Sequence, residues 1–209
     1  MRNTMMVLGA VALAGGGANA QAGETIAKPA PGAKKLFLDE HVLGPGHVTL
    51  EAAAGAHARD LATQGKHGVA FKAYWVDEKS GTIRCLVEAP SADAVNHVHK
   101  EAHGLLASKI VPVTGDNLNW SPAPGRKLYL DVHHLGAGKV TAEAVAAAHA
   151  KDLAAQDKHG VKMLNYWFDA DTGTVRCLIE APSEQAALAV HREAHGLMPE
   201  SITEVSEGR

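Results

Sequence analysis

Histidine is the residue that offers the most chemistry in this chain, because 13 of its 209 residues are histidines. His99 and His103 stand four positions apart, about one turn of a helix, so their rings share one stripe. His57 stands at helical spacing from apolar neighbours, and we expect its ring to point toward an apolar interior. Imidazole suits nickel, zinc and copper, and a histidine pair becomes a metal site once a third or fourth ligand joins it.

The same histidine pattern occurs a second time further along the chain. We therefore predict two equivalent sites for Ni(II) or a similar divalent transition metal, with the ligands His57, His99, His103, His149, His191 and His195. The nearest further ligands for the first site are Asp60, Cys85, Glu101 and His67. A second choice of ligands comprises His41, Glu88, His133, Glu180, His67 and His159.

A simpler interpretation stands beside this one, since a histidine pair on an alanine-rich helix is commonly just solvated. His47, His97 and His134 have no counterpart in the other pattern, and we interpret them as surface residues.

A second candidate site is the open face of a predicted sheet. There a histidine beside a carboxylate would act as a general base, while a tyrosine and an arginine orient an anion. Its members are Asp39, His41, Tyr74, Arg84 and Glu88, with Asp131, His133, Tyr166, Arg176 and Glu180 as counterparts. The alternative is an ion-pair network that only neutralises an interface, and we favour it because no side chain resembles an activated nucleophile. The sequence therefore does not favour an enzyme.

The sequence segments that position these residues occur twice in the chain. Asp39 matches Asp131 and Cys85 matches Cys177 at one constant offset without a gap, and more than half of the positions from Lys35 to Asp116 are identical to their partners. This self-similarity indicates a gene duplication.

Within the first copy, the periodicity of apolar residues and the positions of turn-forming residues predict strands over 35–41, 69–76, 82–89 and 109–113. Thr49 and Ser91 should begin two helices, which Gly68 and Gly104 end. The order β-α-β-β-α-β predicts an α+β fold of the ferredoxin-like type, with both helices on one face of a four-stranded antiparallel sheet. We expect the two tandem βαββαβ modules to form a pseudo-dimer with their sheets packed face to face.

The two-residue period of a strand assigns the side chains of the first strand to faces. We expect Leu36 and Leu38 under the helices, which sends Phe37, Asp39 and His41 to the open face.

The two cysteines, Cys85 and Cys177, should lie on the helix-facing side of equivalent central strands. Because they lie under different helix layers, they cannot approach the roughly 5.5 Å Cα separation of a disulfide. We expect buried free thiols.

Composition excludes nucleic acid as a partner, since a formal net charge of −3 with scattered charges gives no basic stripe. The N-terminal residues 1–20 combine Arg2, an apolar run and small residues ending at Ala20, which is typical of a secretory signal peptide. The apolar run is shorter than the roughly 20 residues that span a bilayer. We expect a periplasmic or secreted protein that no segment holds in a membrane after cleavage.

The expected division of the chain has five parts. These are a signal peptide (1–20), a linker (21–33), a first module (34–116), a second linker (117–125) and a second module (126–207).

Three segments of the second copy carry a family resemblance. They read HGVKMLNYWFD from His159, VRCLIEAPS from Val175 and HREAHGL from His191. They resemble the DUF4242 family of small bacterial proteins, and the resemblance covers both copies. That family includes a nickel-binding, nickel-responsive, ferredoxin-like homodimer from an actinomycete, so the resemblance implies metal binding and paired modules. The chain departs from the family's common form, a single cytoplasmic module, in its duplication and its signal-like segment.

We therefore expect an exported protein that binds a nickel-like metal as a buffer or sensor. Two alternatives stay open. One is a small-molecule or enzymatic site in the cavity between the sheets, which fold analogy alone suggests. The other is a structural interaction module that binds neither metal nor small molecule.

Overall fold

The structure of the protein is a computed structural model that describes residues 34–115 and 120–209. The expected signal peptide and first linker, residues 1–33, lie outside the described residues, as do residues 116–119. All described residues belong to one compact unit. Within these ranges, no helix has both the length and the apolar character that a membrane crossing needs.

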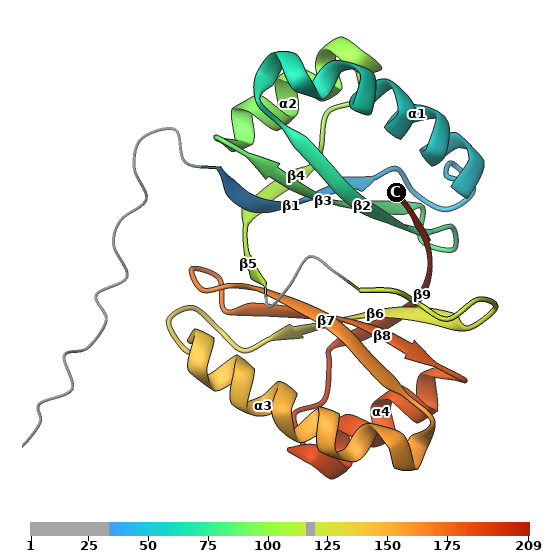
Figure 1. Ribbon diagram of the computed structural model, residues 1–209, viewed down its shortest axis with the longest axis vertical. Coiled ribbons are helices and arrows are strands. Elements are labelled where there is room, and N and C mark those ends of the chain that lie inside the picture. The colour runs from blue at the N-terminus through green and yellow to red at the C-terminus, as the bar shows by residue number, and fades with distance from the viewer. Residues whose placement is uncertain (1–33, 116–119) are drawn as a thin grey trace, which may run out of the picture. The chain divides into compact units, whose positions relative to one another are not determined.

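The first module has the expected order of elements (Figure 1). They are β1 (Lys35–Val42), α1 (Leu50–Thr63), the 3₁₀ helix η1 (Gln64–His67), β2 (Ala70–Asp77), β3 (Thr82–Ala89), α2 (Ala92–Ala102) and β4 (Lys109–Pro112). Thr49 caps α1 by accepting a hydrogen bond from the N–H of Ala52, and Ser91 caps α2 through the N–H of Ala94. Gly68 follows η1 with a φ of 66°, a left-handed conformation that glycine adopts readily. The predicted helix starts are confirmed.

The second module repeats this order after a short strand, β5 (Thr114–Gly115). Its elements are β6 (Lys127–His134), α3 (Ala142–Ala155), η2 (Gln156–His159), β7 (Lys162–Asp169), β8 (Thr174–Ala181), α4 (Glu184–Ala194) and β9 (Ser201–Gly208). Thr141 and Ser183 cap α3 and α4 as their counterparts cap α1 and α2.

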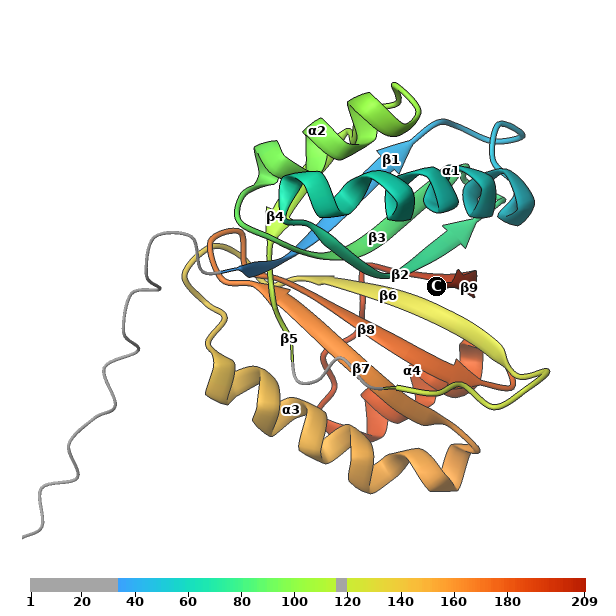
Figure 2. The ribbon, with the colours of Figure 1, turned by 45° about the horizontal axis from the view of Figure 1, so that its top comes forward.

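Each module forms a four-stranded antiparallel sheet with its two helices on one face. The strand orders are β4-β1-β3-β2 and β9-β6-β8-β7. Figures 1 and 2 show α1 and α2 over the first sheet and α3 and α4 over the second. This is the predicted ferredoxin-like arrangement in two tandem copies.

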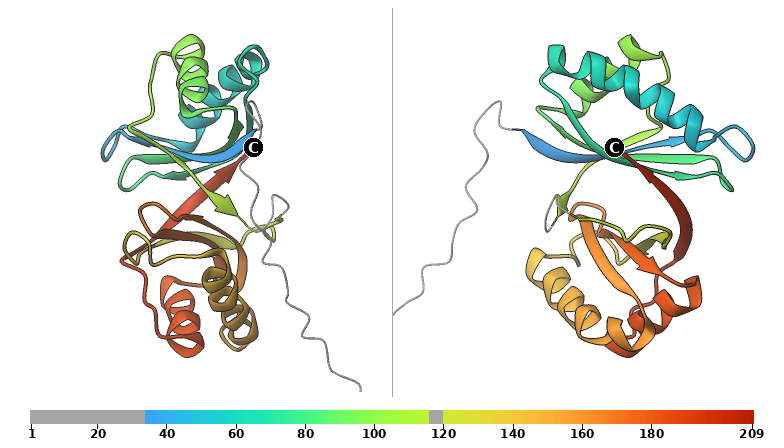
Figure 3. Two further views of the ribbon diagram at one scale, coloured as in Figure 1. Left: turned by 90° about the vertical axis from the view of Figure 1, so that its left-hand side faces the viewer. Right: turned by 45° about the vertical axis from the view of Figure 1, so that its right-hand side comes forward.

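The two sheets are joined at their edges by strands that pair with both modules. β5 continues from β4 and pairs with β7. β9 pairs with β6 through residues 201–205 and then with β2 through residues 206–208. Figure 3 shows β9 running from the second module to the edge of the first sheet. The nine strands therefore follow one order, β4-β1-β3-β2-β9-β6-β8-β7-β5.

Apolar side chains fill the layer between the two sheets. Leu86 and Leu178, both 0% exposed, lie there with three tryptophans. The ring centroids of Trp75 and Trp167 are 4.9 Å apart, and that of Trp120 is 5.7 Å from that of Trp75. The predicted pseudo-dimer with sheets packed face to face is confirmed.

A separate apolar core lies between helices and sheet in each module. Cys85 and Cys177 lie in these cores as buried free thiols, as expected. Burial raises the pKa of both thiols well above the usual value. This disfavours the thiolate, the form in which cysteine binds metals.

The structure corrects the face assignment of the first strand. β1 pairs with β3 so that Asp39 lies opposite Cys85, and directly paired residues project to the same side of a sheet. Phe37 belongs to the helix-side core, whereas Leu38 belongs to the core between the sheets. The prediction that Leu36 and Leu38 lie under the helices was wrong. Both alternate sets of this strand contain large apolar residues, so hydrophobicity did not determine which set faces the helices.

Candidate metal centre

The first candidate centre is built around His99, in the last turn of α2, whose side chain is 1% exposed. Its Nε2 atom lies 3.1 Å from Oδ2 of Asp39 on β1. Its Nδ1 atom lies 3.1 Å from Oδ1 of Asp60 on α1. Both aspartates are buried. One imidazole therefore lies between two buried carboxylates that come from a strand and a helix.

His103, the C-terminal cap of α2, completes a triangle of ligand atoms. Its Nε2 atom lies 3.1 Å from Oδ1 of Asp60 and 3.3 Å from Nδ1 of His99. The N–H of Leu105 donates a hydrogen bond of 3.2 Å to the other nitrogen, Nδ1, and so orients the ring. We call Asp60, His99 and His103 the Asp60 triad.

His41 on β1 approaches His99 from the sheet. Its Nε2 atom lies 3.6 Å from Oδ1 of Asp39, and its ring meets that of His99 edge to face with centroids 4.8 Å apart. We call Asp39, His41 and His99 the Asp39 triad. Within each triad the potential ligand atoms all lie within 4.8 Å of one another. The two triads share His99.

The second module repeats this arrangement. Nε2 of His191 lies 2.7 Å from Oδ2 of Asp131, and its Nδ1 lies 3.1 Å from Oδ1 of Asp152. Nε2 of His195 lies 3.1 Å from the same oxygen of Asp152, and Nε2 of His133 lies 3.5 Å from Oδ2 of Asp131. The duplication thus preserves the geometry of the centre as well as its residue types.

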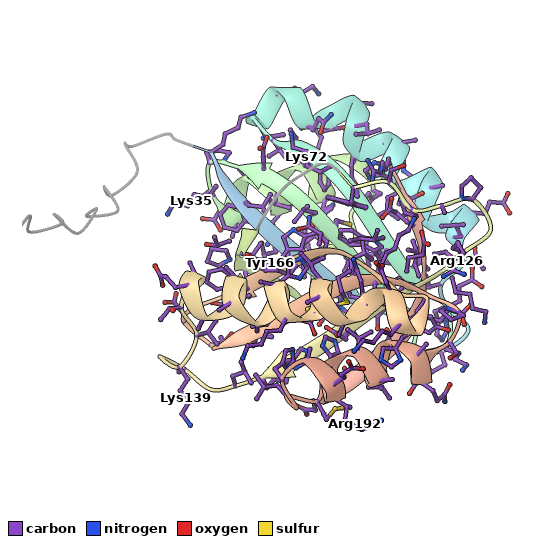
Figure 4. All side chains as sticks on the ribbon, turned by 60° about the horizontal axis from the view of Figure 1, so that its bottom comes forward. Lys35, Lys72, Arg126, Lys139, Tyr166 and Arg192 are labelled. Atoms are coloured by element: carbon purple, nitrogen blue, oxygen red, sulfur yellow. The ribbon has the colours of Figure 1, made fainter. Side chains whose placement is uncertain are left out.

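The helix period separates the buried His191 from its exposed neighbour. His191 is 1% exposed, whereas the adjacent Arg192 is exposed and points away from α4 (Figure 4).

Protonation of the central histidines is governed by their carboxylates. Burial lowers the pKa of His99, but hydrogen bonds to Asp39 and Asp60 outweigh that effect and raise the pKa to about 9. The same balance raises the pKa of His191, between Asp131 and Asp152, to about 9. Without a metal, both rings are therefore imidazolium cations at neutral pH.

The neighbouring histidines behave in the opposite way. Burial lowers the pKa of His41 and that of His57, so both rings are neutral at pH 7. Each ring then keeps a lone pair that can bind a metal ion.

Several buried polar atoms in and beside the first centre have no hydrogen-bond partner among the described residues. They are Oδ1 of Asp39, Nδ1 of His41 and Nδ1 of His57. Buried polar atoms without partners are uncommon in folded proteins. In the second module, Oδ1 of Asp131 instead accepts a 2.9 Å hydrogen bond from the N–H of Cys177. These unpartnered atoms surround the Asp60 triad, and none of them belongs to it.

His57, a predicted ligand, lies beside the centre without joining either triad. It is buried on α1 and lines the same cavity as the triads. Its ring packs on that of Tyr74 with centroids 4.7 Å apart, and His149 packs on Tyr166 at 4.8 Å. Asp60, one turn after His57 and expected only as a further ligand, contacts His99 in its place.

His67 and His159, among the second-choice ligands, lie in surface ion pairs. Nε2 of His67 is 3.0 Å from Oε2 of Glu101, and Nε2 of His159 is 3.0 Å from Oε2 of Glu193. Lysines 66 and 158 contact the same carboxylates. The structure does not bring these histidines to the triads.

The predicted sheet-face site is not assembled as one site. Asp39, His41 and Tyr74 face the helices, because Asp39 and Tyr74 both pair with Cys85. The arginine and glutamate of that prediction, with their counterparts, instead lie on strand positions of the other face, namely Arg84, Glu88, Arg176 and Glu180. Glu88 pairs with Lys72 at 2.7 Å, and Glu180 with Arg126 at 3.1 Å. For Asp39 and His41, the error follows from the wrong face of the first strand.

The two centres differ in the space beside them. In the second module a cavity of about 190 Å³ adjoins His133 and His195, with Leu135 and Val140 among its apolar walls. The corresponding cavity of the first module holds about 30 Å³.

One carboxylate of the second centre could not be predicted from the histidine pattern alone. Asp152 was not singled out, although it matches Asp60 at the constant offset of the repeat. The available signal was this match together with the helical spacing from His149 to Asp152, which puts both on neighbouring stripes of one helix.

Both modules match the model of one protein family, described as "Nickel responsive protein SCO4226-like", over residues 37–113 and 129–205. The motifs suggested the name DUF4242, and the match is to this related family. The two matched ranges include every member of the four triads.

The chain is similar to several solved structures, which differ in sequence identity and in the share of the chain that they cover. SCO4226 from Streptomyces coelicolor A3(2) is 43% identical, with 36% of this chain and 90% of that chain covered and a TM-score of 0.34. The putative chlorite dismutase TA0507 is 12% identical, with 84% and 94% covered and a TM-score of 0.47. A putative monooxygenase from Lactobacillus acidophilus NCFM is 9% identical, with 84% and 94% covered and a TM-score of 0.44. A search of curated proteins found no match.

Proposed function

Because the chain belongs to the SCO4226-like family of nickel-responsive proteins, we propose that each of its modules binds one divalent transition metal ion, with Ni(II) as the first candidate. The observation that carries the proposal is the convergence of histidine and aspartate ligand atoms on one central imidazole in both modules.

The Asp60 triad has the spacing of a metal-binding face. Its three ligand atoms are separated by 3.1, 3.1 and 3.3 Å. Ligands at right angles around an ion, with bonds of roughly 2.1 Å, are separated by about 3.0 Å. We assign Asp60, Nδ1 of His99 and Nε2 of His103 as ligands, with Asp152, His191 and His195 as their counterparts. Nitrogen and oxygen ligands of this kind suit Ni(II), Zn(II) and Co(II).

Asp39 then acts as a positioning residue for the ligand His99. Histidines that bind metals usually donate their other ring N–H to a carboxylate, which fixes the ring and raises its basicity. Nε2 of His99 faces Asp39 at 3.1 Å, as this role requires. His41 lies beside the same carboxylate, and its Nδ1 atom has no hydrogen-bond partner among the described residues. His41 is therefore a candidate for a further ligand.

Metal binding at this triad must displace a proton from His99. The ring is an imidazolium in the metal-free protein, and a metal needs the lone pair that this proton occupies. The two carboxylates that hold the imidazolium would then balance the charge of the dication.

The proposed role is that of an exported metal buffer or sensor, located in the periplasm or outside the cell. The support for export is the signal-like composition of residues 1–20. Cell fractionation of the full-length chain, with N-terminal sequencing of the mature protein, tests this part alone. Mature protein that begins near Gln21 outside the cytoplasm supports it, and an uncut chain in the cytoplasm contradicts it.

Calorimetric titration of tag-free protein with Ni(II), checked by elemental analysis, tests the metal site. We expect two ions per chain, one after His103→Ala, and none after His103→Ala combined with His195→Ala. His97→Ala is the matched control, because this exposed histidine lies on α2 outside the triads. Undiminished binding by the double variant, or no binding by the unchanged protein, would exclude the proposed ligands.

A further inference from the structure

The two halves of the layer between the sheets differ in how their arginines are paired. Nε of Arg84 on β3 donates a 2.7 Å hydrogen bond to Oε2 of Glu40. The equivalent Arg176 on β8 is 6% exposed, and its Nε and Nη1 have no hydrogen-bond partner among the described residues. Glu40 is the strand partner of Arg84, whereas Val132 is that of Arg176. The second copy has therefore lost the carboxylate that neutralises the arginine in the first.

A buried tryptophan shows the same loss. Nε1 of Trp75 donates a 2.9 Å hydrogen bond to Oε2 of Glu207, its strand partner on β9. The equivalent Trp167 is 0% exposed, and its strand partner on β5 is Gly115. Across the part of the chain that the structure covers, Nε1 of Trp167 has no hydrogen-bond partner. A second carboxylate of one half is thus missing from the other.

The two donors without partners are neighbours on one face. Trp167 and Arg176 are directly paired on β7 and β8, so their side chains project to the same side of the sheet. Trp167 and Leu178 lie in the core between the sheets, which places Arg176 on that side as well.

The missing partner must be a hydrogen-bond acceptor, and beside a guanidinium an anionic acceptor fits best. Burial, and then the positive charge of Arg84, lower the pKa of Arg176, while the nearby charges of Glu40 and Asp169 raise it, and an arginine stays protonated at neutral pH. A guanidinium and an indole N–H can only donate hydrogen bonds. Buried guanidinium N–H groups without an acceptor are costly to the fold, and the strand partners Val132 and Gly115 supply no carboxylate to accept from them.

We propose that a small carboxylate or oxoanion binds between the two sheets at Arg176, with Trp167 as a second donor, in place of the carboxylates that Glu40 and Glu207 supply in the other half. A guanidinium presents parallel N–H bonds to two oxygens, which fits a planar anion of the size of formate or nitrate. This site lies on the sheet face opposite the metal triads, and so it is independent of the proposed metal function.

Thermal melts of metal-free protein at constant ionic strength test the proposal, with formate and nitrate as the probes. At a hundredfold excess over the dissociation constant, we expect a rise of roughly 5 to 10 °C in the melting temperature. Tryptophan fluorescence should change over the same concentration range, because the indole of Trp167 gains a partner. A larger rise in melting temperature with formate than with nitrate would identify the bound anion as a carboxylate. A larger rise with nitrate would identify it as an inorganic oxoanion.

Val132→Glu is the decisive variant, since it restores the pair that Glu40 and Arg84 form in the first module. We expect it to melt at the temperature of the anion-saturated protein and to lose the response to both probes. Glu40→Val is the converse control and should add a second anion response. Equal responses in Val132→Glu and the unchanged protein would show a general salt effect and overturn the proposal.

Two further variants keep the proposal testable in every case. If Val132→Glu does not fold, Arg176→Met removes the charge instead and should abolish the anion response. Asp116→Asn tests whether the chain supplies its own anion, because Asp116 follows Gly115 and lies outside the described residues. If the unchanged protein responds to neither probe and the Asp116→Asn variant responds to both, the chain supplies its own anionic partner. That result would overturn the proposal.

Discussion

The Nε2 atom of His191 lies 2.7 Å from Oδ2 of Asp131, a residue 60 positions earlier in the chain. This contact joins α4, which carries His191, to β6 beneath it. It leaves Nδ1 of His191 directed at Asp152, 3.1 Å away. The orientation of this proposed ligand is therefore set by a strand residue that need not touch the metal.

Asp131→Asn should weaken metal binding at the second module while leaving the first module unchanged. The amide keeps the shape of the side chain but is a weaker partner for the second ring N–H, and loss of such a partner typically costs about 10- to 100-fold in metal affinity. Competition with a coloured chelator measures the two affinities. Asp171→Asn, at an exposed position, is the control. Equal affinities in both variants would show that Asp131 has no positioning role.

The metal-free protein should lose stability as the pH rises from about 6.5 to about 9. The pKa of His99 and that of His191 are about 9 in the folded protein, against 6.5 for an ordinary histidine. Protonated rings therefore stabilise the fold fully below pH 6.5, and this contribution disappears as the pH passes through 9. Urea denaturation across this range measures the effect, which His99→Gln combined with His191→Gln should flatten.

Metal affinity should follow the opposite trend. Because an ion must displace the proton from each central histidine, the affinity for Ni(II) should rise through the same pH window, and binding at pH 7 should release protons. Calorimetry in buffers of different ionisation enthalpy counts these protons. Binding that releases no protons would mean that neither His99 nor His191 is a ligand.

Replacing glycine by alanine should change the free energy of unfolding in opposite directions at two positions. Gly81 has a φ of +68°, and a Cβ atom there would lie 1.7 Å from the carbonyl oxygen of Gly44. Gly81→Ala should therefore reduce the free energy of unfolding by more than about 2 kcal/mol. Gly55 lies within α1 with nothing within 4 Å of an added Cβ, so Gly55→Ala should stabilise by about 0.5 to 1 kcal/mol. Urea denaturation compares the two, and similar effects of both would contradict the turn geometry.

The layer between the sheets should be essential to stability. Leu86 is 0% exposed there, and Leu86→Ala should cost about 2 to 5 kcal/mol through lost burial and a cavity. Leu61 is 40% exposed and provides the control, Leu61→Ala, with a much smaller cost. Equal costs in thermal or urea unfolding would mean that the two sheets do not pack as described.

The secondary structure could be predicted closely because its signals are local. Thr49 and Ser91 cap helices through backbone groups three residues away, and Gly68 adopts its left-handed turn at the predicted place. The exchange of edge strands was not predicted. The pairing of β9 with both β6 and β2 depends on contacts between the modules, which no local pattern contains.

The candidate centre could be predicted only in part, for the same reason. The spacing of His99 and His103 on one helix indicated two of the proposed ligands. His57 and Asp60 lie one turn apart on α1, and the packing of α1 against α2 decides which of them meets His99. The face of Asp39 depended on its register with Cys85, which the apolar pattern of the strand left undetermined.

X-ray diffraction from nickel-soaked crystals, measured on both sides of the nickel absorption edge, tests the central claim most directly. We predict one anomalous peak per module, within bonding distance of Asp60, His99 and His103 in the first and of Asp152, His191 and His195 in the second. Peaks confined to the surface pairs of His67 and His159, with the triads retaining their metal-free hydrogen bonds, would contradict the account.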